Sequence, residues 1–200
     1  MKPYYSYLLG SIIVFSTWLS LNAQENLTDL YYSGNYRELI DSSDALIASG
    51  DTAFNTFYLK ALSEAQLGQT PKAIATLKRA LALHPGDHRL NRMLARQYFD
   101  AGDYVQARQG YADLIHWDST DVSSWLRLAE MASFRQQYDE AIIALNQVLA
   151  IDSLNLSSLM MMGDILNRHN NSGAVVYYMR AYRLYPENQK AAYSLGNWYI

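Results

Sequence analysis

The chain has 200 residues, half of them hydrophobic and 13% aromatic, and with only four prolines and ten glycines it favours helices over a β-sandwich or disorder. Its 16 Lys and Arg residues against 19 Asp and Glu residues give a net charge of −3, which offers no electrostatic reason to expect a nucleic-acid partner. The absence of cysteine excludes disulfides, cysteine-based zinc sites, cysteine nucleophiles and a lipid-modified N-terminal cysteine.

Residues 1–23 have the composition of a secretory signal peptide. Lys2 supplies a positive charge, the run from Leu8 to Leu21 carries none, and a polar stretch opens at Gln24. We therefore predict cleavage after Ala23 and export, with the periplasm of a Gram-negative bacterium as the expected compartment. The mature chain would have 15 basic and 19 acidic residues, or −4, because Lys2 is the one charge removed. The alternative is an uncleaved membrane anchor, although the run is shorter than the roughly 20 residues of a spanning helix.

Small residues recur with a period of 34 through the rest of the chain. With Phe54 as column 1 of a unit, Ala or Gly fills column 8 five times and column 20 four times. The column-8 residues are Ala61, Ala95, Ala129, Gly163 and Gly196, and the column-20 residues are Ala73, Ala107, Ala141 and Ala174. Small side chains allow two helices to approach closely where they cross. A period of this size predicts helical hairpins stacked in a row, each packed on its neighbours.

The period divides the chain into consecutive segments. Residues 24–53 form a degenerate N-terminal unit, in which Gly34-Asn35-Tyr36 matches the turn of later units but Leu39 replaces the small residue of column 20. Four units follow at residues 54–87, 88–121, 122–155 and 156–188. The fourth is one residue shorter, through a deletion that we place near Asn170. Residues 189–200 begin a fifth unit and contain its first helix only.

Boundary residues of the units are typical of helix ends. The last column of each full unit has a short side chain with an acceptor oxygen, which can cap the next helix. These residues are Asp87, Asp121, Asn155 and Asn188. Thr70-Pro71 places proline in the first turn of a second helix, where its missing N–H costs nothing. Pro85 and Pro186 mark where second helices end.

These residues resemble the tetratricopeptide repeat family, whose signature is W-x2-L-G-x2-Y, then A-x3-F, then P. The unit from residue 122 has the corresponding residues Trp125, Leu128, Ala129, Ala141 and Leu145. The resemblance covers about residues 26–200, with mild departures such as Lys60 in place of Leu. It implies an all-α fold, an α-solenoid of helix–turn–helix repeats wound into a right-handed superhelix. It also implies a concave groove, lined by the first helix of each unit, that binds peptides or partner proteins.

The groove is expected to present columns 2, 5, 9 and 12 of the first helices. In the second unit these columns hold Arg89, Arg92, Arg96 and Phe99. Three arginines on one helix face predict a clamp for an acidic or C-terminal peptide, because the guanidinium is a planar fork suited to carboxylates. The arrangement looks like the carboxylate clamps of some tetratricopeptide repeat proteins. The alternatives are a solvated face, or a pair between Arg96 and Glu130 at column 9 of the next unit.

Further groove candidates come from the other units. They are Asn55, Tyr58, Met160, Asp164 and Tyr193. Tyr and Met are useful at binding surfaces, and Asp164 continues the acidic side that begins at Glu130. For the apolar members, ordinary packing between adjacent helices is the alternative.

No catalytic or metal-binding pattern stands out. His84 and His88 are four residues apart, but Pro85-Gly86 lies between them, so that no helix aligns their rings. His116 and His169 have no cysteine or clustered carboxylates to complete a metal site. We therefore expect no metal, no other cofactor and no enzymatic activity.

The sequence as a whole predicts an exported scaffold for protein–protein interaction, with a protein or peptide partner, no nucleic acid, and no membrane span unless the signal segment stays uncleaved. The alternative function is the N-terminal sensor region of a longer membrane-bound signalling protein, with a kinase or transcription regulator after residue 200. It arises because the fifth unit lacks its second helix, which would leave an apolar face exposed. A catalytic domain after residue 200 is a third hypothesis, without support in these residues.

Overall fold

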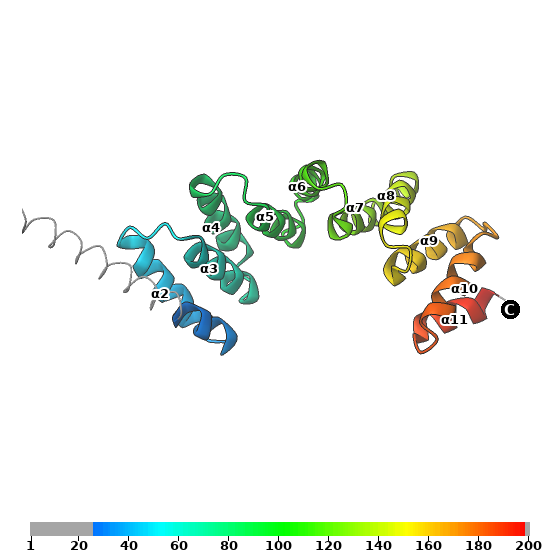
Figure 1. Cartoon of the computed structure of the whole chain (residues 1–200), viewed down its shortest axis with the longest axis horizontal. Helices are drawn as coiled ribbons and strands as arrows, with labels where there is room; N and C mark the ends of the chain where they lie inside the picture. The colour runs from blue at the N-terminus through cyan, green and yellow to red at the C-terminus, as the bar shows by residue number, and fades with distance from the viewer. Residues whose placement is uncertain (1–25, 199–200) are drawn as a thin grey trace, which may run out of the picture. The chain divides into compact units, whose positions relative to one another are not determined.

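The computed structural model describes residues 26–198, and these residues form only α-helices joined by short turns (Figure 1). They fall into two compact units, residues 26–103 and residues 104–198, which are described separately. Unit 1 contains helical residues 26–32, α2 (Tyr36–Ala48), α3 (Phe54–Gln66), α4 (Thr70–Leu83) and α5 (His88–Asp100). Unit 2 contains α6 (Tyr104–Trp117), α7 (Val122–Phe134), α8 (Tyr138–Ile151), α9 (Leu156–Arg168), α10 (Ala174–Leu184) and α11 (Gln189–Trp198).

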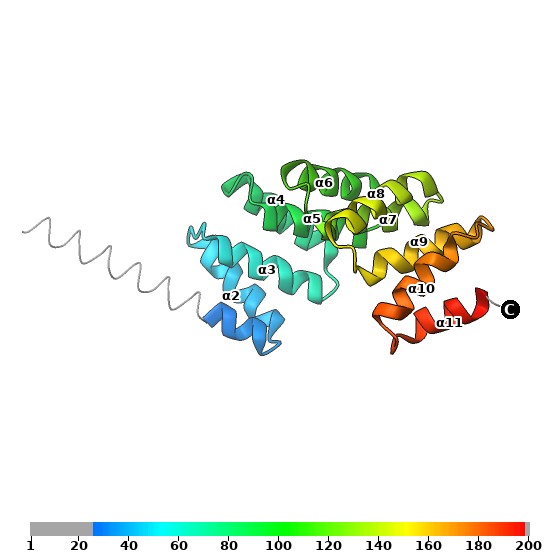
Figure 2. The same cartoon turned by 45° about the vertical axis from the view of Figure 1, so that its right-hand side comes forward.

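Within each unit, successive helices pack side by side (Figure 2). In unit 1, α3 packs on α2 and α4, and α4 packs on α5. In unit 2 the same contacts run from α6 through to α11. This arrangement confirms the predicted fold class, an all-α solenoid of helix–turn–helix repeats. The signal-peptide prediction concerns residues 1–23, which lie outside the described residues, and no helix within 26–198 is long and apolar enough to span a membrane.

The repeated small residues lie where helices meet. Eight of the nine residues in columns 8 and 20 are buried, and the exception is Gly196, which is exposed. Around them lie large apolar side chains, such as Phe57, Leu77 and Leu90 in the core of unit 1, each at most 1% exposed. Burying a side chain of that size contributes roughly 2 kcal/mol. The spacing of 34 is therefore the spacing of the core contacts.

A turn with left-handed backbone joins the two helices of each hairpin. Five residues in this turn have positive φ and recur at the same period as the small-residue columns: Gly34, Gly68, Gly102, Gln136 and Asn170. Glycine adopts this conformation without steric penalty, whereas a side chain pays about 1–2 kcal/mol. The series begins at Gly34, so the degenerate N-terminal unit has the same turn as the others.

The deletion in the fourth unit shortens its second helix. The helices α4, α6 and α8 each have 14 residues, whereas α10 has 11 and begins at Ala174, the column-20 residue. Asn171 accepts a hydrogen bond from the backbone N–H of Gly173 at 2.8 Å and shapes the shortened entry. The missing residue is thus absorbed before the helix, and the core columns keep their places.

The predicted caps are confirmed at all four boundaries. The side chain of Asp87 accepts from two backbone N–H groups of α5, and that of Asp121 from two of α7. Asn155 accepts from the N–H of Ser158, and Asn188 from that of Ala191 at 3.0 Å. Each bond satisfies a donor that the first helical turn would otherwise leave unpaired.

Candidate functional site

One exposed surface in unit 1 gathers most of the predicted contact residues. We call it the first-helix face, and it consists of Asn55 and Tyr58 on α3 with Arg89, Arg92, Arg96 and Phe99 on α5. Asn55 and the three arginines are exposed, and the two aromatic residues are half-buried. Because an α-helix repeats every 3.6 residues, burying one side of α3 and α5 turns Asn55 and the three arginines outward, whereas Tyr58 packs partly against the core.

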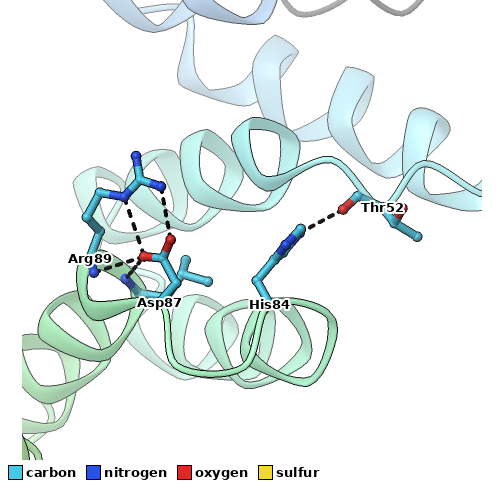
Figure 3. A network of polar contacts seen from close by, with 5 residues as sticks. Thr52, His84, Asp87 and Arg89 are labelled. Atoms are coloured by element: carbon cyan, nitrogen blue, oxygen red, sulfur yellow. Dashed lines mark hydrogen bonds and ion pairs between the residues drawn. The ribbon is translucent and has the colours of Figure 1, made fainter.

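Arg89 is fixed by an acid and an aromatic ring. Its Nη2 donates to Asp87 Oδ2 at 2.9 Å, and the two side chains face each other in Figure 3. The guanidinium lies 3.9 Å from the centre of the Phe54 ring, which is stacked on Tyr58 at 5.2 Å. The hydrogen bond from Arg89 is the main cause that lowers the pKa of Asp87, and the same bond raises the pKa of Arg89. Arg89 is thus part of a cluster formed with Asp87, Phe54 and Tyr58.

Arg96 is held less firmly than Arg89. Its Nε lies 3.9 Å from a carboxylate oxygen of Asp100, and both side chains are well exposed, at 68% and 44%. An exposed pair at that distance contributes little to stability. Arg92 lies one turn before Arg96 on the same helix and is also exposed. The two arginines therefore present their side chains to solvent on one side of α5, where an incoming carboxylate can reach both.

A second contact fixes the edge of this surface and was not predicted from the sequence. His84 Nε2 lies 2.8 Å from the carbonyl oxygen of Thr52, so that the end of α4 is tied to the loop before α3 (Figure 3). The His84 ring also meets the Phe54 ring edge-on, at 6.0 Å. Phe54 was missed as well, although as the column-1 residue it directly precedes the candidate Asn55. Together these contacts give the face a fixed aromatic base.

The candidates in unit 2 lie in different surroundings. Glu130 accepts from Arg127 at 2.7 Å within α7, so it has a partner on its own helix. Asp164 accepts from the Tyr178 hydroxyl at 2.9 Å and from Lys190 at 3.1 Å. Burial, and then the bond to Asp164, raise the pKa of Tyr178. Asp164 is therefore tied into the packing of α9 on its neighbours.

Met160 and Tyr193 differ sharply in exposure. Tyr193 on α11 is 70% exposed, as a contact residue should be. Met160 is only 4% exposed and packs in the core of α9, α10 and α11, which corrects its assignment to the groove. Met160 is buried because it packs with Tyr178 of α10 and Ala191 of α11, where a flexible Met side chain fills the space between the helices. Within residues 26–198, no group of three His, Asp or Glu side chains is arranged to hold a metal ion.

Sequence profiles match the middle of the chain. A tetratricopeptide repeat profile matches residues 64–132, and a second one matches residues 122–153. The chain therefore contains tetratricopeptide repeats, and its fold is an α-solenoid built from them. No curated protein gives a significant sequence match.

Several solved structures share this fold. A crystal structure of MamA is 15% identical, with a TM-score of 0.73 over 81% of this chain and 95% of that one. MamA residues 41–end from Desulfovibrio magneticus RS-1 is 13% identical, with a TM-score of 0.75 over 84% and 95%. YrrB, a tetratricopeptide repeat protein with an unusual peptide-binding site, is 13% identical, with a TM-score of 0.71 over 86% and 89%. At such identities the likeness concerns the fold.

Proposed function

We propose that this protein is an exported scaffold whose first-helix face binds an acidic or C-terminal peptide segment of a protein partner. The observation that carries the proposal is the row of exposed arginines on α5 beside the stacked rings of Phe54 and Tyr58. Arginine and aromatic residues are enriched where protein partners bind. The peptide-binding site of YrrB, a protein of the same fold, agrees with a role of this kind.

The charges of the face favour a carboxylate ligand. Arg89 is paired with Asp87, and the proposal is carried by the exposure of the next two arginines on α5, Arg92 and Arg96. They are four residues apart and hence on one side of the helix, where two guanidinium groups can meet neighbouring carboxylates of one peptide. The contact between Arg96 and Asp100 is long and exposed, so that a ligand carboxylate can replace it at small cost.

A binding experiment tests this site. Acidic peptides with a free C-terminal carboxylate would be titrated by fluorescence anisotropy against the full chain and against Arg92→Ala/Arg96→Ala. Each lost contact at an exposed site is worth about 1 kcal/mol, so we expect affinity to fall about tenfold or more. The matched control is Arg37→Ala/Lys72→Ala, which removes the same charge from exposed positions on α2 and α4. Equal losses in both variants would mean bulk electrostatics, and no loss in the first would exclude the clamp.

Export is tested separately, by the mass and location of the native protein. Cell fractionation followed by intact-mass measurement should find a species that starts at Gln24 outside the cytoplasm. A chain that retains residues 1–23 in the membrane fraction would support the uncleaved anchor. A chain found whole in the cytoplasm would contradict export, without affecting the peptide-binding proposal.

A further inference from the structure

An apolar groove on α10 belongs to none of the surfaces discussed above. Its apolar lining residues are Leu154, Val175, Val176, Met179 and Leu184, and the groove is open to solvent, with a volume of about 420 Å³. Val176 is 61% exposed and Leu154 is 52% exposed, values that are high for aliphatic side chains. We call this surface the α10 groove.

The groove occupies the side of α10 that the fold of unit 2 leaves unused. Ala174, Tyr178 and Ala181 on the other side are buried with residues of α9 and α11. Val176, Met179 and Arg183 follow one another at helical spacing of three and four, and hence share a single stripe. From Val176 to Arg183 the stripe extends about 10 Å along the helix, or two turns.

The wall opposite α10 is held in place by hydrogen bonds. Arg180 Nη2 donates to the carbonyl of Ser153 at 2.6 Å, and the Tyr185 hydroxyl donates to the carbonyl of Leu154 at 2.9 Å. The N–H of Leu154 in turn donates to Asp152 at 3.1 Å. The turn that carries Leu154 is thus fastened at two points to α10 and the residue that follows it, and the groove is formed before any ligand arrives. A preformed site avoids the entropy cost of ordering its walls on binding.

The rim of the groove is positively charged. Arg180 and Arg183 line it, and no acidic residue does. Arg180 donates to a neutral carbonyl, and Arg183 makes no hydrogen bond or ion pair within residues 26–198. A second groove of unit 2, with about 250 Å³ between α6, α7 and α8, differs because an acidic residue lines it: Glu140 pairs with Arg108 at 3.0 Å, and Arg135 is the other cation of the lining. The α10 groove therefore has an uncompensated positive rim around an apolar floor.

We propose that the α10 groove docks a two-turn amphipathic segment of a protein partner, with apolar side chains on the floor and carboxylates against Arg180 and Arg183. The charge of the rim selects an acidic segment, and the two-turn stripe sets its length. The concave shape favours a protuberant peptide over the flat surface of an anionic membrane. The site shares no residue with the first-helix face and gives the scaffold a second point of attachment.

The test uses a defined probe, a fluorescein-labelled amphipathic helix of Glu and Leu with Leu at helical spacing. Binding would be measured by anisotropy on the full chain carrying Arg92→Ala/Arg96→Ala, which removes the two arginines proposed to bind carboxylates on the first-helix face. Val176→Ser and Arg183→Gln should each weaken binding about fivefold or more, because one removes apolar floor and the other a charge. The matched controls are Ile143→Ser and Arg135→Gln in the second groove, where Ile143 is as exposed as Val176. These should bind the probe like their parent.

Three results would overturn the proposal. The first is equal weakening by the α10 variants and the controls, which would mean binding without a defined site. The second is unchanged affinity for a probe with Gln in place of Glu, which would contradict the charge selection. The third is that no peptide probe binds above background, while phosphatidylglycerol vesicles bind the parent protein and do not bind Arg183→Gln. That pattern would assign the groove to an anionic membrane.

Discussion

The sharpest test of the packing in unit 1 concerns a buried ion pair. Glu64 is 1% exposed, and Lys60 Nζ lies 2.6 Å from its Oε1. Lys60 is also within 3.1 Å of the Thr76 hydroxyl and 3.4 Å of Asp44, whose side chain is exposed. The family prefers leucine at the position of Lys60, and the structure explains the departure: the ammonium group neutralises a carboxylate that has no access to water.

Replacing Lys60 by methionine keeps the length of the side chain and removes its charge. The attraction in the pair is about 6 kcal/mol at an effective dielectric constant of about 20, before desolvation is subtracted. After that subtraction, breaking a buried pair from one side costs about 3–5 kcal/mol, because the remaining charge stays buried and unpaired. The cost should be near the lower end, since Lys60 is itself 12% exposed.

The double variant Lys60→Met/Glu64→Met provides the control. Removing both charges leaves an apolar contact of similar volume, a change that is often neutral or stabilising. It also removes Glu64 Oε2, a buried atom with no hydrogen-bond partner within residues 26–198. Asp44 is exposed and loses little, and Thr76 loses one bond worth about 1 kcal/mol. We therefore expect the double variant to exceed Lys60→Met in stability by about 2 kcal/mol or more.

Urea unfolding followed by circular dichroism would measure these differences, and amide hydrogen exchange in α3 and α4 would locate them. Local readout matters because repeat arrays can unfold in parts. If Lys60→Met lost less than about 1 kcal/mol, Glu64 would have to be solvated or otherwise compensated, and the reasoning from burial would fail. If the double variant were as unstable as the single one, side-chain packing and not charge would be the cause.

Three further predictions use the same unfolding assay. Gly163→Ala should cost about 1–3 kcal/mol of stability, because its new Cβ would lie 2.5 Å from the Tyr178 ring. The control Gly196→Ala adds a Cβ that meets nothing within 4 Å and should be neutral or slightly stabilising. Equal effects of the two substitutions would contradict the close packing of Gly163 on Tyr178. Gln136→Gly should gain about 0.5–1 kcal/mol, since Gln136 has a φ of 59°, and a loss would show that its side chain compensates for the strain. Asp87→Ala should cost about 1 kcal/mol at neutral pH. Because folding lowers the pKa of Asp87, its charge stabilises the protein above pH 3.8, and this contribution fades as the pH falls through the lowered pKa. Asp87→Asn should keep the cap and lose this pH dependence of stability. An unchanged dependence of stability on pH would contradict the ion pair.

The fold could be predicted from the sequence because its signal lies in buried columns. Ala61 and Ala73 recur at a fixed spacing because only small residues fit where their helices cross. The turn glycines recur because the backbone there is left-handed. Each of these constraints acts within one unit or between adjacent helices. The same residue type therefore recurs in every unit and can be recognised in the sequence.

The surface could be predicted only in part, because the exposure of a side chain depends on its contacts with residues of the neighbouring helix. The positions of Arg89 and Arg96 in columns 2 and 9 correctly indicated that both are exposed. They did not indicate that Arg89 forms an ion pair with Asp87. Column 5 gave an exposed Arg92 in one unit and a buried Met160 in another. Met160 is buried because it packs with residues of the neighbouring helix, α11. A rule based on a single helix cannot contain that information.

The columns that define the repeat are therefore the ones least able to specify a partner. Solved structures share the fold of this chain at identities of only 13–15%, so that most of its side chains are not fixed by the fold. The partner has to be encoded in positions that the repeat leaves free. Two sets of such positions depart from a neutral, polar surface, the arginines of α5 beside Phe54 and the arginines of α10 beside Val176. Arg89 and Arg180 also hold local structure, through Asp87 and the Ser153 carbonyl, whereas within the described part of the chain Arg96 and Arg183 have no such structural contact across helices, and these two surfaces are where a search for partners should begin.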